Sequence, residues 1–529
     1  MSVLDFRFHA LLIAGAFALT SAPILAQSVQ TGAQSTPAVY SAHLPSLRGA
    51  MAQTEGIGAE HRVRQLRQIP LVNVGSQASD PVVQGTAASS AAATAGIGVD
   101  GIGLGLGSYS PRYAPPDTTG AVGDTQYVQW VNVDLAVFDK LTGALVMGPV
   151  AGNTLFKPLG GPCATSNDGD PIVQYDKAAG RWVLSQFAVP GGSAGYWQCV
   201  AVSTTSNATG AYNLYAFPYT QFNDYPKMGV WSDGYYVTFN MFTSTFQGAK
   251  VCAYDRASML TGAPATQQCF QLSSSYASLL PADLDGTTLP PTGAPNYLVN
   301  RQSSGLGFWK FHVDWNAPAN STLTGPTLIP VAAYSAACGG GACIPQPGTT
   351  QKLDSLADRL MFRLAYRNTG SVEQMVVNHA VMVNATRKPG TGNSAVRWYE
   401  IRNMNTSPTV FQQSSYSPDT RFRWMGSAAM DKQGNLAIGY SVGSANDKPS
   451  LAYATRLVGE ATGTLGAETS IQVGGGSQLS NLSRWGDYTQ MSIDPVDDCT
   501  FWYTGQYLKA DGTFNWSTKI ASFKINGCQ

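Results

Sequence analysis

An all-β fold is the first prediction that this 529-residue chain supports, and three observations lead to it. Glycine and proline are abundant, with 56 and 30 residues, as in chains of many short strands joined by turns. Short aromatic and β-branched runs recur along most of the chain. A longer pattern also recurs, in which a strand ends near an Asp and an aromatic-rich strand follows, as in Asp170–Asp176 and then Arg181–Val183. Repetition of this kind predicts a toroidal or solenoid protein.

The repeats also predict how the strands are grouped. From Asp117 to the C-terminus, the strand-like runs form seven units of four, and the last unit lacks one strand. We therefore predict a seven-bladed β-propeller of four-stranded antiparallel blades over residues 110–529. A closed ring needs an N-terminal strand to complete the last blade, and Gln68–Val74 is our candidate. A β-sandwich followed by a second β domain is the alternative architecture.

The N-terminal region predicts export. Within residues 1–26, Arg7 precedes the apolar run 10–19, and Ala26 offers a small residue for signal-peptide cleavage. The apolar run is short for a membrane span, and we expect no transmembrane segment. Residues 27–109 are poor in charge and rich in small residues, which predicts a flexible leader with little core. We therefore expect a secreted or periplasmic protein.

The cysteines agree with an exported protein. All eight follow the signal segment, and an even number in an oxidising compartment predicts disulfides. Positions within or beside single blades favour the pairs Cys163–Cys199, Cys252–Cys269, Cys338–Cys343 and Cys499–Cys528. Spacing alone leaves other connectivities open.

Charge limits the choice of partner. The chain has 32 basic and 32 acidic residues, so its net charge is zero. This balance argues against a nucleic-acid partner and against a membrane surface that binds through bulk charge. We expect a monomer whose partner is an extracellular polysaccharide or another glycan.

Charged side chains nevertheless gather on one predicted face. In a propeller, the loops entering the innermost strands and those leaving the second strands share a face, so their polar residues converge on the central funnel. The candidates for catalysis are Asp117, Asp170, Asp224, Asp283, His379 and Tyr488. The candidates for ligand binding are Arg301, Arg359, Arg421, Arg423, Arg484, Asp487 and Asn240. Acids with arginines suit a ligand that carries hydroxyls and a carboxylate. For any single residue, turn capping or a structural ion pair is the alternative.

Metal binding is a further hypothesis. The segment Asn167-Asp168-Gly169-Asp170 offers oxygen ligands for Ca²⁺ through Asp168 and Asp170. It lacks the spacing of an EF-hand loop, so any calcium site there would be of another kind.

Three stretches resemble a family of secreted, mostly uncharacterised bacterial β-propeller proteins: Asp117–Gly123, Gly169–Val173, and Arg484–Tyr488 with Asp494–Tyr503. The resemblance covers about Asp117–Cys528 and implies a fold and export more than an activity. The architecture is also loosely similar to sialidase-like, carbohydrate-active propellers. Ser232-Asp233-Gly234 and Asp431–Asn435 match the Asp-box of sialidases only in part, so the resemblance assigns no catalytic residue.

Three functions fit these features. A glycoside hydrolase would use two of the four aspartates as acid and as base or nucleophile. A lyase acting on a uronic acid polymer would use His379 or Tyr488 as the base and arginines to neutralise the carboxylate. A non-catalytic adhesin or interaction scaffold would use the same face without a catalytic pair. Carboxylates close together in an enclosed pocket favour the hydrolase, and a broad flat rim favours the scaffold.

Overall fold

The protein is all-β in the residues that its computed structural model describes, namely 28–50, 61–74, 79–89, 92–384 and 392–529. The predicted signal segment 1–26 lies outside these residues. The helices in the described part are short: α1 (Leu47–Ala50), α2 (Gly161–Thr165), α3 (Arg256–Thr261) and the 3₁₀ helices η2 (Gly152–Leu159), η3 (Gly192–Ala194), η4 (Pro318–Asn320) and η5 (Ala337–Gly340). No helix found there has the length and apolar character needed to cross a bilayer.

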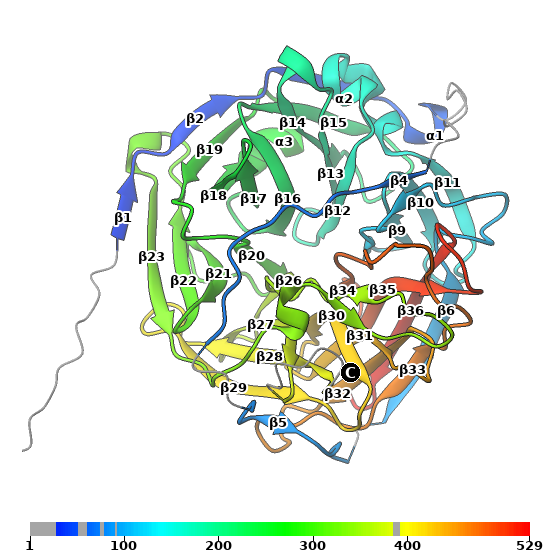
Figure 1. Ribbon diagram of the computed structural model, residues 1–529. Helices are drawn as coiled ribbons and strands as arrows, with labels where there is room; N and C mark the ends of the chain where they lie inside the picture. The colour runs from blue at the N-terminus through cyan, green and yellow to red at the C-terminus, as the bar shows by residue number, and fades with distance from the viewer. Residues whose placement is uncertain (1–27, 51–60, 75–78, 90–91, 385–391) are drawn as a thin grey trace, which may run out of the picture.

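Strands that follow one another along the chain pair in antiparallel sheets, and Figure 1 shows these sheets arranged round a common centre. The first sheet contains β8 (Thr119–Val122), β9 (Gln126–Trp130), β10 (Asp134–Asp139) and β11 (Leu145–Ala151). The second contains β12 (Gly169–Asp176), β13 (Arg181–Ala188), β14 (Tyr196–Ser203) and β15 (Tyr212–Tyr219). The third contains β16 (Phe222–Val230), β17 (Tyr235–Phe242), β18 (Phe246–Tyr254) and β19 (Thr266–Gln271).

The next two groups of strands are joined into one ten-stranded sheet, because β20 pairs in parallel with β26. The first group is β20 (Leu280–Asp285), β21 (Asn296–Gln302), β22 (Gly305–His312) and β23 (Thr322–Ile329). The second group is β26 (Met361–Asn368), β27 (Glu373–Met382), β28 (Ser394–Arg402) and β29 (Thr409–Tyr416). Between them lies the small hairpin of β24 (Ala342–Ile344) and β25 (Leu353–Asp354).

Two further sheets complete the chain. One contains β30 (Phe422–Met430), β31 (Leu436–Gly443), β32 (Ser450–Arg456) and β33 (Thr469–Gln472). The other contains β34 (Gln490–Ile493), β35 (Thr500–Leu508) and β36 (Trp516–Ile525). The strand-like runs that defined the predicted repeats fall within or at the edges of these strands, so the all-β prediction is confirmed.

Much of the predicted flexible leader is bound to the outer edges of the sheets, which corrects that prediction. The leader strands are β1 (Ser28–Thr31) on β23, β2 (Gln34–Pro37) on β19, β3 (Tyr40–Leu44) on β15, β5 (Val83–Gln84) on β29 and β6 (Ala93–Asp100) on β36. The composition misled us because an edge strand is held mainly by backbone hydrogen bonds and needs little core of its own. Figure 1 shows the blue strands β1 and β2 along the rim of the molecule.

The strand that completes the last sheet is β6, so the prediction that Gln68–Val74 supplies it is wrong. The small residues of β6 explain why it fits there. A Cβ at Gly96 would lie 2.5 Å from Ser522 Oγ on β36, a distance that no real side chain shows. By contrast, the only bridge recorded for Gln68–Val74 among the described residues joins Val74 to Tyr334.

The four predicted disulfides are all present. The structure joins Cys163 to Cys199, Cys252 to Cys269, Cys338 to Cys343 and Cys499 to Cys528. Cys252 and Cys269 lie opposite each other on the paired strands β18 and β19, so their side chains are close enough to form a disulfide.

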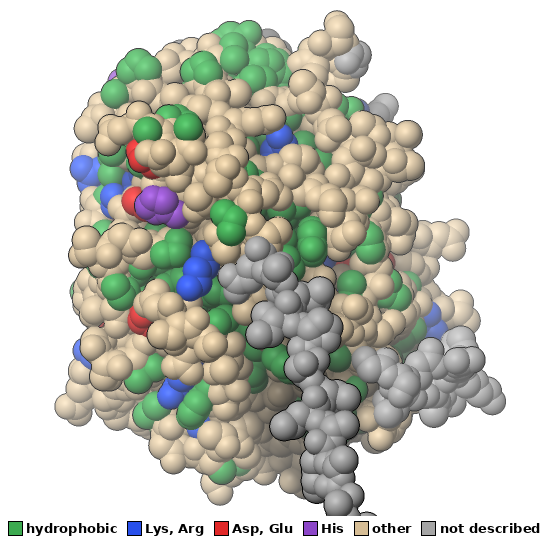
Figure 2. Space-filling model, turned by 90° about the vertical axis from the view of Figure 1, so that its left-hand side faces the viewer, with side chains coloured by type: hydrophobic (Ala, Val, Ile, Leu, Met, Phe, Trp, Pro, Cys, Tyr) green, Lys and Arg blue, Asp and Glu red, His purple; other side chains and the backbone are tan. Residues whose placement is uncertain are grey.

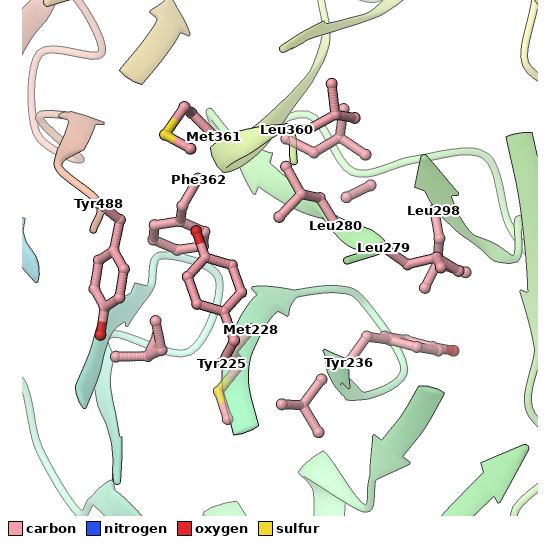
Figure 3. Close-up of a cluster of buried hydrophobic side chains, with 14 of the residues drawn as sticks. Tyr225, Met228, Tyr236, Leu279, Leu280, Leu298, Leu360, Met361, Phe362 and Tyr488 are labelled. Atoms are coloured by element: carbon pink, nitrogen blue, oxygen red, sulfur yellow. The ribbon is translucent and has the colours of Figure 1, made fainter. Parts of the chain in front are cut away.

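The apolar core lies between neighbouring sheets and near the centre of the molecule. Trp130, Trp182, Trp231 and Trp485 are buried in it. Figure 3 shows one central part, where Tyr225, Phe362 and Tyr488 lie together. The outer surface is different: the face in Figure 2 carries charged side chains as scattered spots without a broad charged patch.

Candidate functional site

An acidic pocket lies where the loops entering several sheets meet. Its cavity has a volume of about 400 Å³. The residues that line it are Arg64, Gln65, Leu66, Arg67, Asp117, Asp168, Asp170, Phe187, Val189, Phe222, Asp224, Tyr225, Arg359, Arg484 and Asp487. Seven of the predicted site residues are therefore brought together: Asp117, Asp168, Asp170, Asp224, Arg359, Arg484 and Asp487.

The backbone places these side chains at a conformational cost. Asp117, Asp170, Tyr225 and Asp487 have φ values of 48°, 47°, 55° and 60°, in the left-handed region that residues other than glycine rarely adopt. Each lies at or just before the innermost strand of its own sheet. Such backbone strain persists only where the surrounding structure enforces it, and it gathers at functional sites.

Asp117 and Asp170 form a pair of carboxyl groups that interact directly. Burial raises the pKa of Asp117 well above its usual value, and the charges of Asp487 and Asp170 raise it further. Burial likewise raises the pKa of Asp170, and a hydrogen bond with the Asp117 side chain opposes that rise. Two buried carboxyls in contact share one proton, because both cannot ionise at little cost. One oxygen of Asp117, Oδ1, is buried without a hydrogen-bond partner.

Asp224 is a third carboxyl group with altered titration. Burial and the charge of Asp170 raise its pKa to about 7, against the opposing charges of Arg359, Arg67 and Arg484. Asp224 is therefore protonated in mildly acidic solution, where an ordinary surface aspartate is ionised. A proton held at this position is what a general acid requires.

Two arginines of the pocket are held by carboxylates next to them. Arg359 donates to both oxygens of Asp358, at 2.7 and 3.0 Å, and its guanidinium lies 4.3 Å from the centre of the Tyr225 ring. Arg484 donates to both oxygens of Asp487. These pairs fix the direction of each guanidinium and leave donors for a ligand.

Lys227 lies beneath the pocket and was missed by the sequence analysis. Its Nζ lies 3.5 Å from the centre of the Tyr225 ring and 3.8 Å from that of Tyr488, and it donates to Pro226 O at 2.8 Å. Burial lowers the pKa of Lys227 to about 7. Its position three residues after Asp224, within the innermost strand β16, was the signal that could have identified it.

Tyr488 lies below the cavity rather than on its wall. It is fully buried, and its hydroxyl donates to Pro171 O at 3.0 Å. Its ring packs edge-on against that of Tyr225 with 5.9 Å between centroids, as the close-up in Figure 3 shows. Tyr488 therefore supports the pocket and holds Lys227, but does not face the cavity.

Arg64 and Arg67 were also missed, since both belong to the leader. The Arg67 guanidinium lies 4.7 Å from the centre of the Phe222 ring, and both arginines line the cavity. The signal was the basic cluster Arg62-Val63-Arg64-Gln65-Leu66-Arg67 in a region otherwise poor in charge.

Asp283, predicted as catalytic, lies in the interior instead. It accepts from Arg363 Nε at 2.6 Å, Gln174 Nε2 at 2.9 Å and Val230 N at 2.9 Å, and only 3% of it is exposed. The sequence identified an acid on an innermost strand but not its depth along that strand. Its partners make it part of a buried network that links neighbouring sheets.

His379 and Asn240 are also away from the pocket wall. His379 is fully buried, its Nε2 lies 2.9 Å from Tyr399 Oη, and burial with the charges of Arg301 and Arg397 lowers its pKa well below the usual value. Asn240 bonds both Ser278 N and Ser278 Oγ at 2.8 Å, which ties β17 to the start of the next sheet. Both side chains have structural partners.

Three of the predicted ligand-binding arginines are elsewhere as well. Arg421 and Arg423 pair with Asp419 and Glu468, at 2.8 to 2.9 Å, in an ion network beside β30. Arg301 lines a separate small cavity, and it donates to Tyr334 Oη at 3.0 Å and to Ala357 O. The charge-rich loops of the sequence led us to predict that these arginines bind a ligand. For Arg421 and Arg423, however, the guanidinium groups are already paired with neighbouring carboxylates.

The structure gives the calcium hypothesis no further support. Across the described ranges, no group of three or more His, Cys, Asp or Glu side chains is placed to hold a metal ion. Asp168 Oδ2 accepts a hydrogen bond from Val189 N at 2.6 Å, so part of its capacity is already used. Calcium binding at Asp168 and Asp170 stays a prediction.

Comparisons with known proteins add little. No protein-family model matches the chain, and no curated protein matches it. Similar solved structures include an ulvan lyase of polysaccharide lyase family PL25, at TM-score 0.34 and 12% identity over 81% of this chain and 97% of that one. A Hadza microbial sialidase has TM-score 0.34 and 10% identity, covering 77% of this chain and 75% of that one. The N-terminal domain of Nup159 has TM-score 0.32 and 7% identity, covering 84% and 99%. Structural similarity at these TM-scores supports no conclusion about the fold or the activity of this chain.

Proposed function

We propose that the protein is an exported seven-bladed β-propeller that binds an extracellular glycan in the acidic pocket and hydrolyses a glycosidic bond there. The observation that carries the proposal is the pocket itself, which has a volume of about 400 Å³ and gathers aspartates, arginines and aromatic rings in a chain of low charge. Hydroxyl-rich ligands are recognised by such charged donors and acceptors, with aromatic rings beside them. A recessed cavity of this volume favours the hydrolase over the flat-faced scaffold.

The carboxyl groups supply the two roles that glycoside hydrolysis needs. Asp224, with its pKa near 7, is the proton donor to the leaving oxygen. The Asp117–Asp170 pair holds one proton between two carboxyls, so its ionised member is the base or nucleophile. Arg359 and Arg484 orient the sugar through donors that their own carboxylate partners do not use.

The lyase hypothesis has less support. His379 would have to take a proton from the substrate, yet it is buried against Tyr334 and Tyr399, with ring centroids 4.6 and 5.7 Å away. Tyr488 is buried beneath the pocket. We therefore assign neither residue a catalytic role.

Architecture and export belong to the same proposal. The groups of strands around the centre, each ending with an outer strand, are what seven blades would give, with β6 completing the last. Four disulfides are typical of proteins that fold in an oxidising compartment, which supports secretion or a periplasmic location.

The test is a screen of the purified protein against neutral and acidic polysaccharides. Reducing-end release reports hydrolysis, and absorbance of unsaturated products reports elimination. Asp224→Asn should lower hydrolysis by about 100-fold or more, because it removes the proton donor without changing its shape. Asp447→Asn is the matched control, since Asp447 is exposed in a loop and its carboxylate bonds Ser444 Oγ. Unsaturated products would contradict hydrolysis, and equal activity of both variants would contradict the role of Asp224.

A further inference from the structure

A leader segment that we call the strap, residues 61–74, crosses the face that carries the acidic pocket. Figure 1 shows it as the blue chain that runs from β4 (Arg62–Val63) in front of β12, β16 and β20. Arg64, Gln65, Leu66 and Arg67 of the strap form part of the pocket wall. The strap therefore lies over the place where a ligand would enter.

Main-chain oxygens of the strap occupy donors that belong to the body of the protein. Arg484 Nη1 donates to Arg64 O, and Arg301 Nη2 donates to Val72 O. All the hydrogen bonds recorded for Arg301 within the described residues go to neutral oxygens, those of Tyr334, Ala357 and Val72. Only 4% of Arg301 is exposed. A buried guanidinium without a carboxylate partner is costly, and a ligand anion would relieve that cost.

The strap is attached mainly near its ends. His61 stacks on Phe514 with centroids 4.6 Å apart, and β4 pairs in parallel with β7 (Tyr113–Ala114). At the other end, Asn73 Oδ1 accepts from Ala336 N at 2.8 Å, and Val74 pairs with Tyr334. Between these ends Ile69 is the one buried side chain, whereas Leu71 is 44% exposed and Gln65 and Gln68 are also exposed. Segments with few buried contacts open at low free-energy cost.

The distance along the strap indicates the size of the ligand. The two carbonyls that accept from Arg484 and Arg301 are separated by eight residues, and an extended chain of that length spans at most about 29 Å. Arg359 lies between the two ends of this row, since it lines both the acidic pocket and the small cavity that Arg301 lines. Arg359 and Arg484 keep N–H donors beyond those that Asp358 and Asp487 use, and Arg301 donates to neutral oxygens alone. Such a row of donors suits a chain of linked anionic units better than a single sugar.

We propose that Arg484, Arg359 and Arg301 line a groove for an extended anionic polysaccharide, and that the strap fills this groove as an intramolecular stand-in for the ligand. This inference rests on the proposed function and specifies its substrate as an acidic polymer. Ligand and strap compete for the same donors, so loosening the strap raises the apparent affinity for the polymer.

The test loosens the strap without touching the groove. The double variant His61→Ala/Asn73→Ala removes one contact at each end of the full-length protein. The matched control is Thr36→Ala/His43→Ala, which removes two leader contacts on the outer rim, to Gln267 and Asn213. Thermal melting verifies that both variants fold. Calorimetry then measures binding of polygalacturonate and of neutral laminarin, and phenylglyoxal labelling with peptide mass spectrometry measures access to Arg301 and Arg484.

We expect the strap variant to bind polygalacturonate about tenfold more tightly than the control, with Arg301 and Arg484 labelled faster. If Arg301 and Arg484 stay protected in the variant and the affinity for polygalacturonate is unchanged, the strap does not compete with the ligand. This result would overturn the proposed role of the strap and would leave glycan binding intact. If the arginines are labelled faster but neither polysaccharide binds, both the proposed polysaccharide ligand and the proposed function would be overturned. Tighter binding of laminarin alone would overturn the acidic substrate class.

Discussion

Asp224 is the residue whose protonation state matters most for the chemistry proposed in the pocket. Its pKa is raised to about 7 by burial and by Asp170, and a general acid works only in its protonated form. We therefore expect kcat/KM to fall tenfold per pH unit above pH about 7, as the proton is lost. A pH profile of hydrolysis measures this limb. In Asp224→Asn, the alkaline limb of the pH profile should vanish together with the activity. If the limb of the wild-type profile began near pH 4 instead, another carboxyl group would be the acid.

Lys227 makes a second prediction, which concerns stability rather than activity. Its pKa is lowered to about 7 in the folded protein by burial, whereas an unfolded lysine titrates near 10.4. The unfolded state thus binds more protons between these values, so this lysine adds stability as the pH rises from about 7 to 10. The change is at most about 1.4 kcal/mol per pH unit.

Lys227→Met isolates this contribution, because methionine fills similar space and does not titrate. The difference in free energy of unfolding between wild type and variant should shift in favour of wild type between pH 7 and 10, as measured by urea denaturation. Lys432→Met is a control at an exposed lysine in the turn between β30 and β31, away from the pocket. A difference that stays constant over this range would mean that Lys227 carries its charge throughout.

At the scale of strands and loops, the sequence was informative about local structure. Strand positions followed from aromatic and β-branched runs, and the disulfide pairs followed from strand neighbours. The depth of a side chain along its strand did not follow, which is why Asp283 and Asp224 looked equivalent before their partners were known. Partners of Arg301 and Arg484 in the leader were also hidden, because contacts more than two hundred residues apart leave no local signal.

The leader strand β6 gives a prediction that separates the structure from the simpler sequence-based hypothesis. Ile97 N donates to Ser522 Oγ at 2.9 Å, and proline there would remove this donor from a strand held by its backbone. We expect Ile97→Pro to lower the free energy of unfolding by about 3 kcal/mol. Gln68→Pro, at an exposed residue of the segment first expected to complete the sheet, should have little effect on thermal melting. If Gln68→Pro destabilised the protein more than Ile97→Pro, the hypothesis that Gln68–Val74 completes the last sheet would be restored.

A buried ion pair also joins the leader to the sheets. Arg397 Nη2 contacts Asp80 Oδ1 at 2.5 Å, and both side chains are fully buried. Asp80→Asn leaves a buried cation with no balancing charge, so we expect a loss of about 3 to 5 kcal/mol in the free energy of unfolding. Chemical denaturation against the exposed control Asp447→Asn measures it. A loss below about 1 kcal/mol would mean that this part of the leader opens readily.

On the scale of the whole molecule, the pocket depends on residues that only the global arrangement brings together. Asp117 precedes β8 and Asp487 precedes β34, so the two residues are far apart in the sequence, yet the charge of Asp487 raises the pKa of Asp117. The last sheet combines β6 from the leader with β34, β35 and β36 from the C-terminus, so the two ends of the chain stabilise each other. Loss of structure at either end should therefore reach the pocket.

The disulfides test this dependence across the molecule. Their sequence separations are 36, 29, 17 and 5 residues for the pairs that begin at Cys163, Cys499, Cys252 and Cys338. Because a cross-link restricts the unfolded chain more when its loop is longer, paired Cys→Ser variants should lose stability in that order, from about 4 kcal/mol to about 2 kcal/mol. Thermal melting of the four double variants gives the ranking. Removal of Cys499–Cys528 should in addition speed proteolysis within β6, since the bridge anchors the sheet that β6 completes, whereas removal of Cys252–Cys269 should leave β6 protected. Equal protection of β6 in both variants would mean that the last sheet holds together without its cross-link.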